Sequence, residues 1–108
     1  MSEVPETTVQ ELHELLASSE APLLIDVRTP AEFNSGHIDG AVNLPLNELP
    51  QRLPELDAAS DRAIVTICRS AKRTIPATQF LHAQGFEAAT QLAGGMLAWH
   101  AAGLPTVR

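Results

Sequence analysis

The stretch "AIVTIC", residues 63–68, carries the strongest strand pattern in the chain. Its residues are apolar or β-branched, which suits a buried strand of a pleated sheet. The loop "RSAKR" follows at residues 69–73, and residues 75–84 then show a helical pattern that ends at Gly85. Glycine readily adopts the left-handed conformation that terminates a helix. A buried strand, a short loop and a helix in this order indicate a fold in which strands and helices alternate.

The segments before this unit extend the alternation toward the N-terminus. Thr8 and Glu11 form a capping-box pattern, which predicts a helix from Val9 to about Ser18. A short apolar run at residues 23–27 predicts a second buried strand.

Three further elements are expected between residues 29 and 54. "TPAEFNSGH", residues 29–37, predicts a short helical turn with Pro30 inside it. "AVNLP", residues 41–45, predicts another strand. Residues 47–53 predict one or two helical turns that are closed by Pro54.

The end of the chain shows a weak strand at residues 89–92, a turn at Gly94 and Gly95, and a last helix at residues 96–102. Short apolar strands that alternate with helices indicate an α/β fold with a mostly parallel central sheet. In such a sheet, ligands bind beyond the carboxyl ends of the strands. Cys68 ends its strand and is therefore expected at that edge.

Composition narrows the range of functions. The 108 residues fit one domain over the whole chain, and 44% of them are hydrophobic, which is enough to fill a core. Seven Lys and Arg against thirteen Asp and Glu give a net charge of -6, which disfavours a nucleic acid as partner. Neither a leader peptide nor a membrane-spanning apolar run is visible, so we expect a cytoplasmic protein that contacts no membrane.

Cys68 is the only cysteine, which excludes an internal disulfide and a cysteine-rich metal site. The N–H groups of residues 69–74 have no strand beside them, so they can form an anion-binding nest at the sulfur. The next helix adds the positive end of its dipole, and Arg69, Lys72 and Arg73 add three cations. These features favour a thiolate and predict an exposed, activated nucleophile. The alternative is a packing cysteine beside a solvated turn.

Three longer blocks surround these elements. They are "LLIDVRTPAEFNSGHIDGAVNLP" at residues 23–45, "IVTICRSAKRT" at residues 64–74 and "GFEAATQLAGGMLAWHAAGLP" at residues 85–105. In sequence and in order, the blocks resemble the rhodanese-like domain family, and the resemblance extends from about residue 8 to residue 105. It implies a three-layer α/β/α sandwich whose active-site loop has four residues between Cys68 and Arg73.

The resemblance implies a sulfurtransferase. Cys68 would attack the outer sulfur of a small anionic donor such as thiosulfate, release sulfite and become a persulfide. The loop residues that would bind the donor are Arg69, Ser70, Ala71, Lys72 and Arg73. Because the chain has no second cysteine, the acceptor must be external, either cyanide or a thiol. No metal or organic cofactor is required.

Two other functions stay open on the sequence. A sulfur-relay or docking module would receive its persulfide from a partner protein and turn over little thiosulfate. Ala71 favours this alternative, because loops of the family often carry Gly there and Ala at a positive φ costs about 1 kcal/mol. A phosphatase of related fold is disfavoured, because those enzymes place their Arg one residue later than Arg73.

Several polar residues near the first long strand could have either a catalytic or a structural role. In one, Asp26 steers the active-site loop and Arg28 binds substrate; in the other, which we favour, they form a partly buried supporting ion pair. His37 could shuttle protons, although pairing with a backbone carbonyl is the commoner role. Asn43 is expected to satisfy backbone groups in a tight bend.

The last block contributes glycines and core residues. We expect Gly94 and Gly95 to permit a turn close to the Cys68 loop, where a side chain would obstruct the pocket. Met96 and Trp99 are expected to pack in the core, with Trp99 alternatively at the pocket rim. The remaining histidines lack metal-ligand spacing and are expected at the surface; they are His13, His82 and His100.

Overall fold

The computed structural model describes residues 4–59 and 62–108, and for residues 57–59 it describes only the backbone. The strands are β1 (Glu6–Thr7), β2 (Leu23–Asp26), β3 (Val42–Asn43), β4 (Ile64–Ile67) and β5 (Ala89–Leu92). The α-helices are α1 (Val9–Leu16), α2 (Pro30–Asn34), α3 (Leu49–Arg52), α4 (Thr74–Ala83) and α5 (Gly95–Ala101). The 3₁₀ segments η1 (Leu46–Glu48) and η2 (Leu53–Ala59) flank α3.

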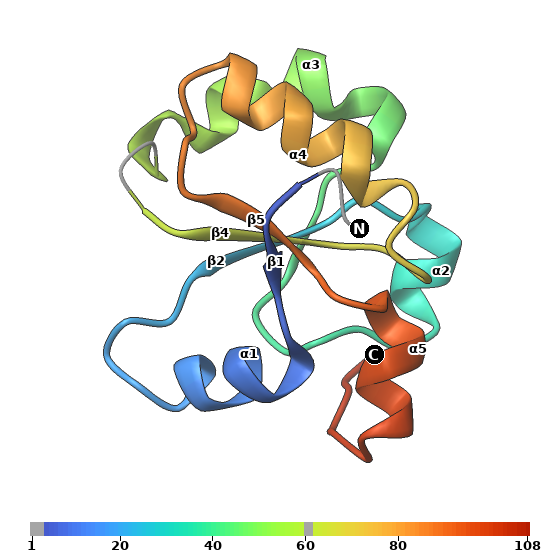
Figure 1. Cartoon of the computed structure of the whole chain (residues 1–108). Coiled ribbons are helices and arrows are strands. Elements are labelled where there is room, and N and C mark those ends of the chain that lie inside the picture. The colour runs from blue at the N-terminus through green and yellow to red at the C-terminus, as the bar shows by residue number, and fades with distance from the viewer. Residues whose placement is uncertain (1–3, 60–61) are drawn as a thin grey trace.

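In the described part of the chain, five strands form one parallel sheet in the order β1-β5-β4-β2-β3 (Figure 1). The central strand β4 pairs with β2 on one side and with β5 on the other. Parallel strands send their carboxyl ends to the same edge of a sheet. The predicted α/β fold is confirmed, and Cys68, one residue beyond β4, lies at the carboxyl edge.

Helices cover both faces of the sheet, with α3 and α4 on one side and α1 and α5 on the other (Figure 1). Side chains of β4 alternate between these faces, as a strand requires. Ile64 and Cys68 belong to the core under α3 and α4, whereas Val65 and Ile67 belong to the core under α1 and α5. The predicted three-layer sandwich is therefore confirmed. Within residues 4–59 and 62–108, no helix is both long and apolar enough to cross a membrane.

The predicted capping box at the start of α1 is confirmed. The N–H of Thr8 donates to the Glu11 carboxylate at 2.9 Å, and the N–H of Glu11 donates to the Thr8 hydroxyl at 3.1 Å. The helix ends at Leu16, slightly before the expected Ser18.

Two elements differ from the sequence predictions. The hydrophobic pattern of the sequence does not indicate β1. Two residues are too few to show the alternation of a strand, and their pairing with β5 joins distant parts of the chain. The turns expected to close at Pro54 instead continue as η2 to Ala59. Pro54 is the second residue of η2, and the fixed φ of proline suits the start of a helical segment.

The amino end of α5 holds the start of the Cys68 loop. The N–H of Met96 donates to the Cys68 carbonyl at 2.8 Å, and the N–H of Leu97 donates to the Arg69 carbonyl at 3.0 Å. Gly95 makes this approach possible, because a side-chain carbon there would lie 2.6 Å from the Arg69 carbonyl oxygen and closer still to that of Cys68. The paired-glycine turn is close to the loop, as predicted, and the atoms that a side chain would meet belong to the backbone.

Gly95→Ala should therefore lower the free energy of unfolding by about 2–4 kcal/mol, because the methyl group meets backbone and the left-handed φ of 59° disfavours a side chain. Gly103→Ala is the matched control. Its φ is 72°, but no atom lies within 4 Å of the added carbon, so it should cost only about 1 kcal/mol. Urea unfolding measures both variants, and equal losses would contradict the role given to the contact with the Cys68 loop.

Candidate active site

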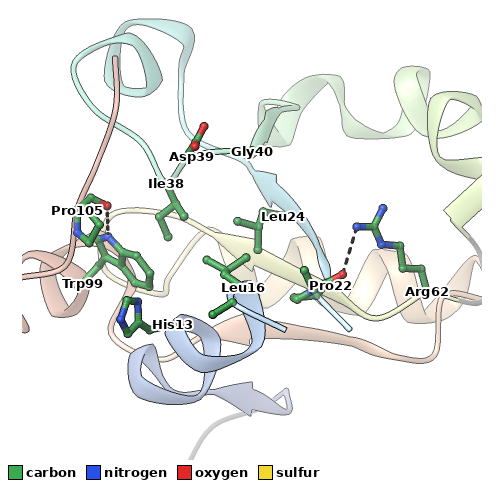
Figure 2. A pocket seen from close by; sticks show the side chains of 12 residues that line it. His13, Leu16, Pro22, Leu24, Ile38, Asp39, Gly40, Arg62, Trp99 and Pro105 are labelled. Atoms are coloured by element: carbon green, nitrogen blue, oxygen red, sulfur yellow. Dashed lines mark hydrogen bonds between the residues drawn. The ribbon is translucent and has the colours of Figure 1, made fainter. Parts of the chain in front are cut away.

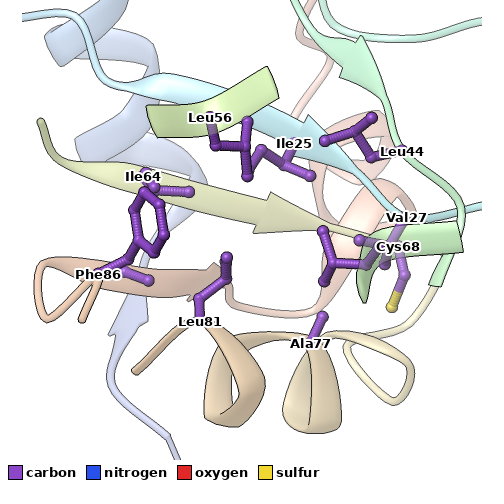
Figure 3. Close-up of a cluster of buried hydrophobic side chains, with 11 residues drawn as sticks. Ile25, Val27, Leu44, Leu56, Ile64, Cys68, Ala77, Leu81 and Phe86 are labelled. Atoms are coloured by element: carbon purple, nitrogen blue, oxygen red, sulfur yellow. The ribbon is translucent and has the colours of Figure 1, made fainter. Parts of the chain in front are cut away.

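Cys68 is covered by its surroundings. The residue is 1% exposed, and it lies at one end of the buried cluster that includes Val27 and Ala77 (Figure 3). The expectation of an exposed nucleophile is wrong, because the following loop curls around the sulfur and brings several N–H groups to it. The sulfur atom of Cys68 therefore lies at the base of the loop.

Hydrogen bonds to the sulfur decide the acidity of Cys68. Burial raises the pKa of the thiol. Hydrogen bonds with the Thr74 hydroxyl and with the N–H groups of Thr74, Ser70 and Lys72 lower the pKa, and their combined effect is larger than that of burial. The hydroxyl oxygen of Thr74 lies 3.7 Å from the sulfur. The net pKa is below the ordinary value for cysteine, which favours the thiolate. The predicted nest of N–H groups, that of Thr74 included, is present, and the hydrogen bond of the Thr74 hydroxyl is an addition that the sequence did not indicate.

The three cations of the loop differ in what they contact. Arg73 forms a bidentate ion pair with Glu32 of α2, with N–O distances of 2.7 and 2.9 Å. These hydrogen bonds from Arg73 are the main reason that the pKa of Glu32 falls to about 2. Arg69 and Lys72 are exposed. Glu32 therefore balances the charge of Arg73, and the ion pair ties the loop to α2.

Asp26 and Arg28 form a buried ion pair at the end of β2. Nε and Nη2 of Arg28 lie 2.9 and 2.8 Å from the Asp26 carboxylate, and Nη2 also donates to the Gly36 carbonyl at 2.9 Å. Asp26 is 0% and Arg28 6% exposed, so the expected ion pair is present and is buried more completely than predicted. Asn43 donates to the carbonyls of Asp26 and Arg28 at 3.0 and 2.9 Å, as expected for a residue that satisfies a bend.

Two histidines lie against backbone carbonyls. Nδ1 of His37 is 2.9 Å from the Phe33 carbonyl oxygen, and the two rings stack with 3.7 Å between centroids. The expected pairing of His37 with a carbonyl is confirmed. His82 was expected at the surface, but it is half-buried, with Nε2 2.8 Å from the Ala89 carbonyl oxygen. That expectation is wrong, because the last turn of α4 faces β5.

A hollow of about 500 Å³ lies on the α1 and α5 side of the sheet, and no residue of the Cys68 loop lines it (Figure 2). Its walls include Leu24, Ile38 and Trp99. Trp99 is 1% exposed and donates its indole N–H to the Pro105 carbonyl at 2.9 Å. Its expected role in the core is confirmed, as is that of the buried Met96. The other two histidines are exposed, as expected; they are His13 and His100.

Ala71 has a φ of 62°, in the left-handed region that favours glycine. The strain that the sequence suggested at this position is therefore present. Its neighbours Ser70 and Lys72 both direct their N–H groups to the sulfur. The loop thus keeps a glycine-like shape with an alanine at its centre.

Fold and site together define a class of small α/β proteins with an acidic cysteine in a loop at the carboxyl edge of a parallel sheet. The sequence profile of the Rhodanese-like domain matches residues 8–102. The chain therefore belongs to the rhodanese-like domain family.

Similar proteins agree with this assignment. The "Sulfurtransferase" of Allochromatium vinosum is 40% identical over 104 residues, which cover 96% of this chain and 95% of the relative. The "Thiosulfate sulfurtransferase GlpE" of Shewanella oneidensis is 34% identical over 102 residues, which cover 94% and 98%. The crystal structure of a rhodanese-related protein from Thermoplasma volcanium has a TM-score of 0.86 at 28% identity and covers 95% and 97% of the two chains. These similarities support sulfur transfer in general.

Ala71→Gly should raise the free energy of unfolding by about 0.5 kcal/mol, because relief of the left-handed strain exceeds the added flexibility of glycine in the unfolded chain. Ala101→Gly, at the exposed last residue of α5, is the control and should lower it by about 0.5 kcal/mol. Thermal unfolding measures both. A loss of stability at position 71 would show that Ala71 is not strained.

Glu32→Gln should destabilise the protein at neutral pH and lose this effect in acid. The pKa of Glu32 is lowered from 4.5 to about 2, so its ion pair with Arg73 stabilises fully above pH 4.5 and is lost as the pH falls through about 2. Both side chains are about one-third exposed, so solvent screening limits the effect to about 1 kcal/mol. Urea unfolding across this pH range measures it. Glu55→Gln breaks a more exposed pair with Arg52 and should cost less; a loss at Glu32 that persists in strong acid would contradict the assignment.

Proposed function

We propose that this chain is a sulfurtransferase that carries a sulfane sulfur as a persulfide on Cys68, with thiosulfate as a donor. The observation that carries the proposal is the group of N–H donors around the sulfur, which favours the thiolate. Similarity to proteins named sulfurtransferase and thiosulfate sulfurtransferase supports the same type of reaction.

In the first half-reaction, the Cys68 thiolate attacks the outer sulfur of thiosulfate. A sulfur–sulfur bond to Cys68 forms, the sulfur–sulfur bond of thiosulfate breaks, and sulfite leaves with the bonding electron pair. The N–H groups of Ser70, Lys72 and Thr74 are already directed at the nucleophile, so no reorganisation is needed to hold its charge before attack.

In the second half-reaction, an external nucleophile, either cyanide or a thiol, attacks the outer sulfur of the persulfide. Cys68 leaves as a thiolate, and a lowered pKa makes it a better leaving group. The chain has no other cysteine, so no internal thiol can take the sulfur. Atoms and electrons balance in this cycle without a metal or an organic cofactor.

The loop would bind the donor through both backbone and side chains. Arg69 and Lys72 are exposed and would attract the anionic donor toward the loop. Arg73 would contribute less charge, because Glu32 balances it, and would hold the loop against α2. The full set of donor-binding residues in the proposal is Arg69, Ser70, Ala71, Lys72 and Arg73.

A sulfur-relay role is the second candidate, and the strained φ of Ala71 favours it. A reshaped loop would turn over thiosulfate slowly while Cys68 still received sulfur from a partner protein. We place either reaction in the cytoplasm, where thiols are kept reduced and can act as sulfur acceptors.

Thiocyanate production from thiosulfate and cyanide tests the proposal. We expect steady turnover by the wild type and only background by Cys68→Ser, because the hydroxyl is a far weaker nucleophile than the thiolate. Mass spectrometry after thiosulfate treatment should show one added sulfur atom on the wild type and none on the variant. Circular dichroism of Cys68→Ser controls for folding.

Other outcomes point elsewhere. Activity retained by Cys68→Ser would show that another group is the nucleophile. Persulfide loading from a cysteine desulfurase, with no thiocyanate from thiosulfate, would support the relay. Hydrolysis of an aryl phosphate would support a phosphatase, and we expect none.

A further inference from the structure

A buried chain of hydrogen bonds leads from Cys68 to the edge of the sheet. Thr74, the first residue of α4, has its hydroxyl oxygen 3.7 Å from the sulfur and donates to Oε1 of Gln91 at 2.7 Å. Gln91, in β5, donates from Nε2 to the carboxylate of Glu6, in β1, at 2.9 Å. Thr74 is 0% and Gln91 2% exposed, so the bonds that Thr74 makes are shielded from water. Glu6 is exposed, so its bond with Gln91 is only partly buried.

The Thr74 hydroxyl has one proton and two acceptors within reach. An ionised carboxylate only accepts hydrogen bonds, so Glu6 draws the NH₂ group of Gln91 to itself and leaves Oε1 facing Thr74. At 2.7 Å, the hydroxyl proton lies in a good bond with Oε1. The Thr74 oxygen can then only accept from a neutral thiol. A thiolate needs the same proton, so Gln91 and charged Cys68 compete for it.

We propose that Gln91 is a positioning residue of this site and acts on Cys68 through Thr74. When the sulfur is neutral, Gln91 holds the hydroxyl proton of Thr74. When the sulfur is charged, the hydroxyl turns to it, and the bond to Gln91 is lost. Gln91 thereby opposes the charged form of Cys68.

The place of this rotation in a reaction rests on the proposed function. In the persulfide, Sγ of Cys68 has two covalent bonds and no charge, so the Thr74 hydroxyl stays with Gln91. As an acceptor takes the outer sulfur, negative charge develops on Sγ and the hydroxyl turns to it. The position of one proton would then follow the charge of Sγ through each cycle.

Charged groups face Cys68 from several neighbouring elements. They are Arg69, Lys72 and Arg73 of the loop, Glu32 paired with Arg73, and Asp26 paired with Arg28, while Glu6 lies farther off beyond Gln91. Gln91→Met leaves both ion pairs and the Glu6 carboxylate in place. If Gln91→Met shifts the pKa of Cys68 only when the Thr74 hydroxyl is present, the shift comes from the hydrogen bonds through Thr74 and Gln91 and not from the ion pairs.

The test is the pH dependence of the ultraviolet absorbance of the Cys68 thiolate, which no tyrosine obscures because the chain has none. Gln91→Met keeps the side-chain length and removes the acceptor of the Thr74 proton. We expect the pKa of Cys68 to fall by about half a unit, about a threefold rise in the ratio of thiolate to thiol. If Gln91 acted only as polar surroundings, the apolar replacement would raise the pKa.

Three further variants show whether the effect passes through Thr74. Thr74→Val should raise the pKa of Cys68, and adding Gln91→Met to it should produce no further shift. Thr74→Ser keeps a hydroxyl and should keep the response to Gln91→Met. Thr78→Val is the matched control, because it removes a hydroxyl of α4 that lies 2.9 Å from the Thr66 hydroxyl. It should lower Tm without moving the pKa of Cys68.

Gln91→Asn withdraws the amide by one methylene and replaces Gln91→Met if that variant does not fold; it should lower the pKa by a smaller amount. An unchanged or raised pKa of Cys68 in Gln91→Met would overturn the inference. So would a fall of the same size when Gln91→Met is added to Thr74→Val. The titration uses no sulfur donor, so its failure is distinct from a lack of sulfurtransferase activity.

Discussion

The convergence of peptide N–H groups on one sulfur atom constrains the whole carboxyl edge of the sheet. The chain leaves β4 and must turn so that the N–H groups of Ser70, Lys72 and Thr74 reach Cys68. The carbonyls of the same turn need partners as well, because buried backbone groups are costly to leave unpaired. The first two carbonyls accept N–H groups from the start of α5. The loop, the glycine turn and α5 therefore form one unit. The N–H groups of the loop bond to the sulfur, and its first carbonyls bond to the N–H groups of α5.

Backbone donors, more than side-chain cations, supply the positive surroundings of the sulfur. Arg73 is balanced by Glu32, and Arg28 is balanced by Asp26, so neither presents a free charge. The two exposed cations of the loop are in contact with solvent, where salt screens them. The N–H groups are fixed, close to the sulfur and shielded. A chain with a net charge of -6 can therefore still favour a thiolate at one point.

The parts of this structure that follow local patterns could be predicted from the sequence, and the parts that join distant residues could not. The apolar periods predict the main strands and helices, and the end of β4 places Cys68 at the sheet edge. The strain at Ala71 follows from the family resemblance, because related loops often carry Gly there. The pairing of Glu32 with Arg73 joins positions 41 residues apart, and no local pattern marks it. Gln91 looks like one polar residue of a weak strand; only the register of β5 beside β1 and β4 brings it to the site. The burial of Cys68 likewise depends on how the loop closes.

The rate at which Cys68 reacts with a small uncharged alkylating reagent, followed over pH at low and high salt, tests the central claim most directly. The single cysteine makes the signal unambiguous. Fixed N–H donors predict a midpoint below the ordinary pKa of cysteine, about 8.5, that salt moves little. A midpoint at or above that value would contradict the account, because burial would then outweigh every hydrogen bond that the loop directs at the sulfur.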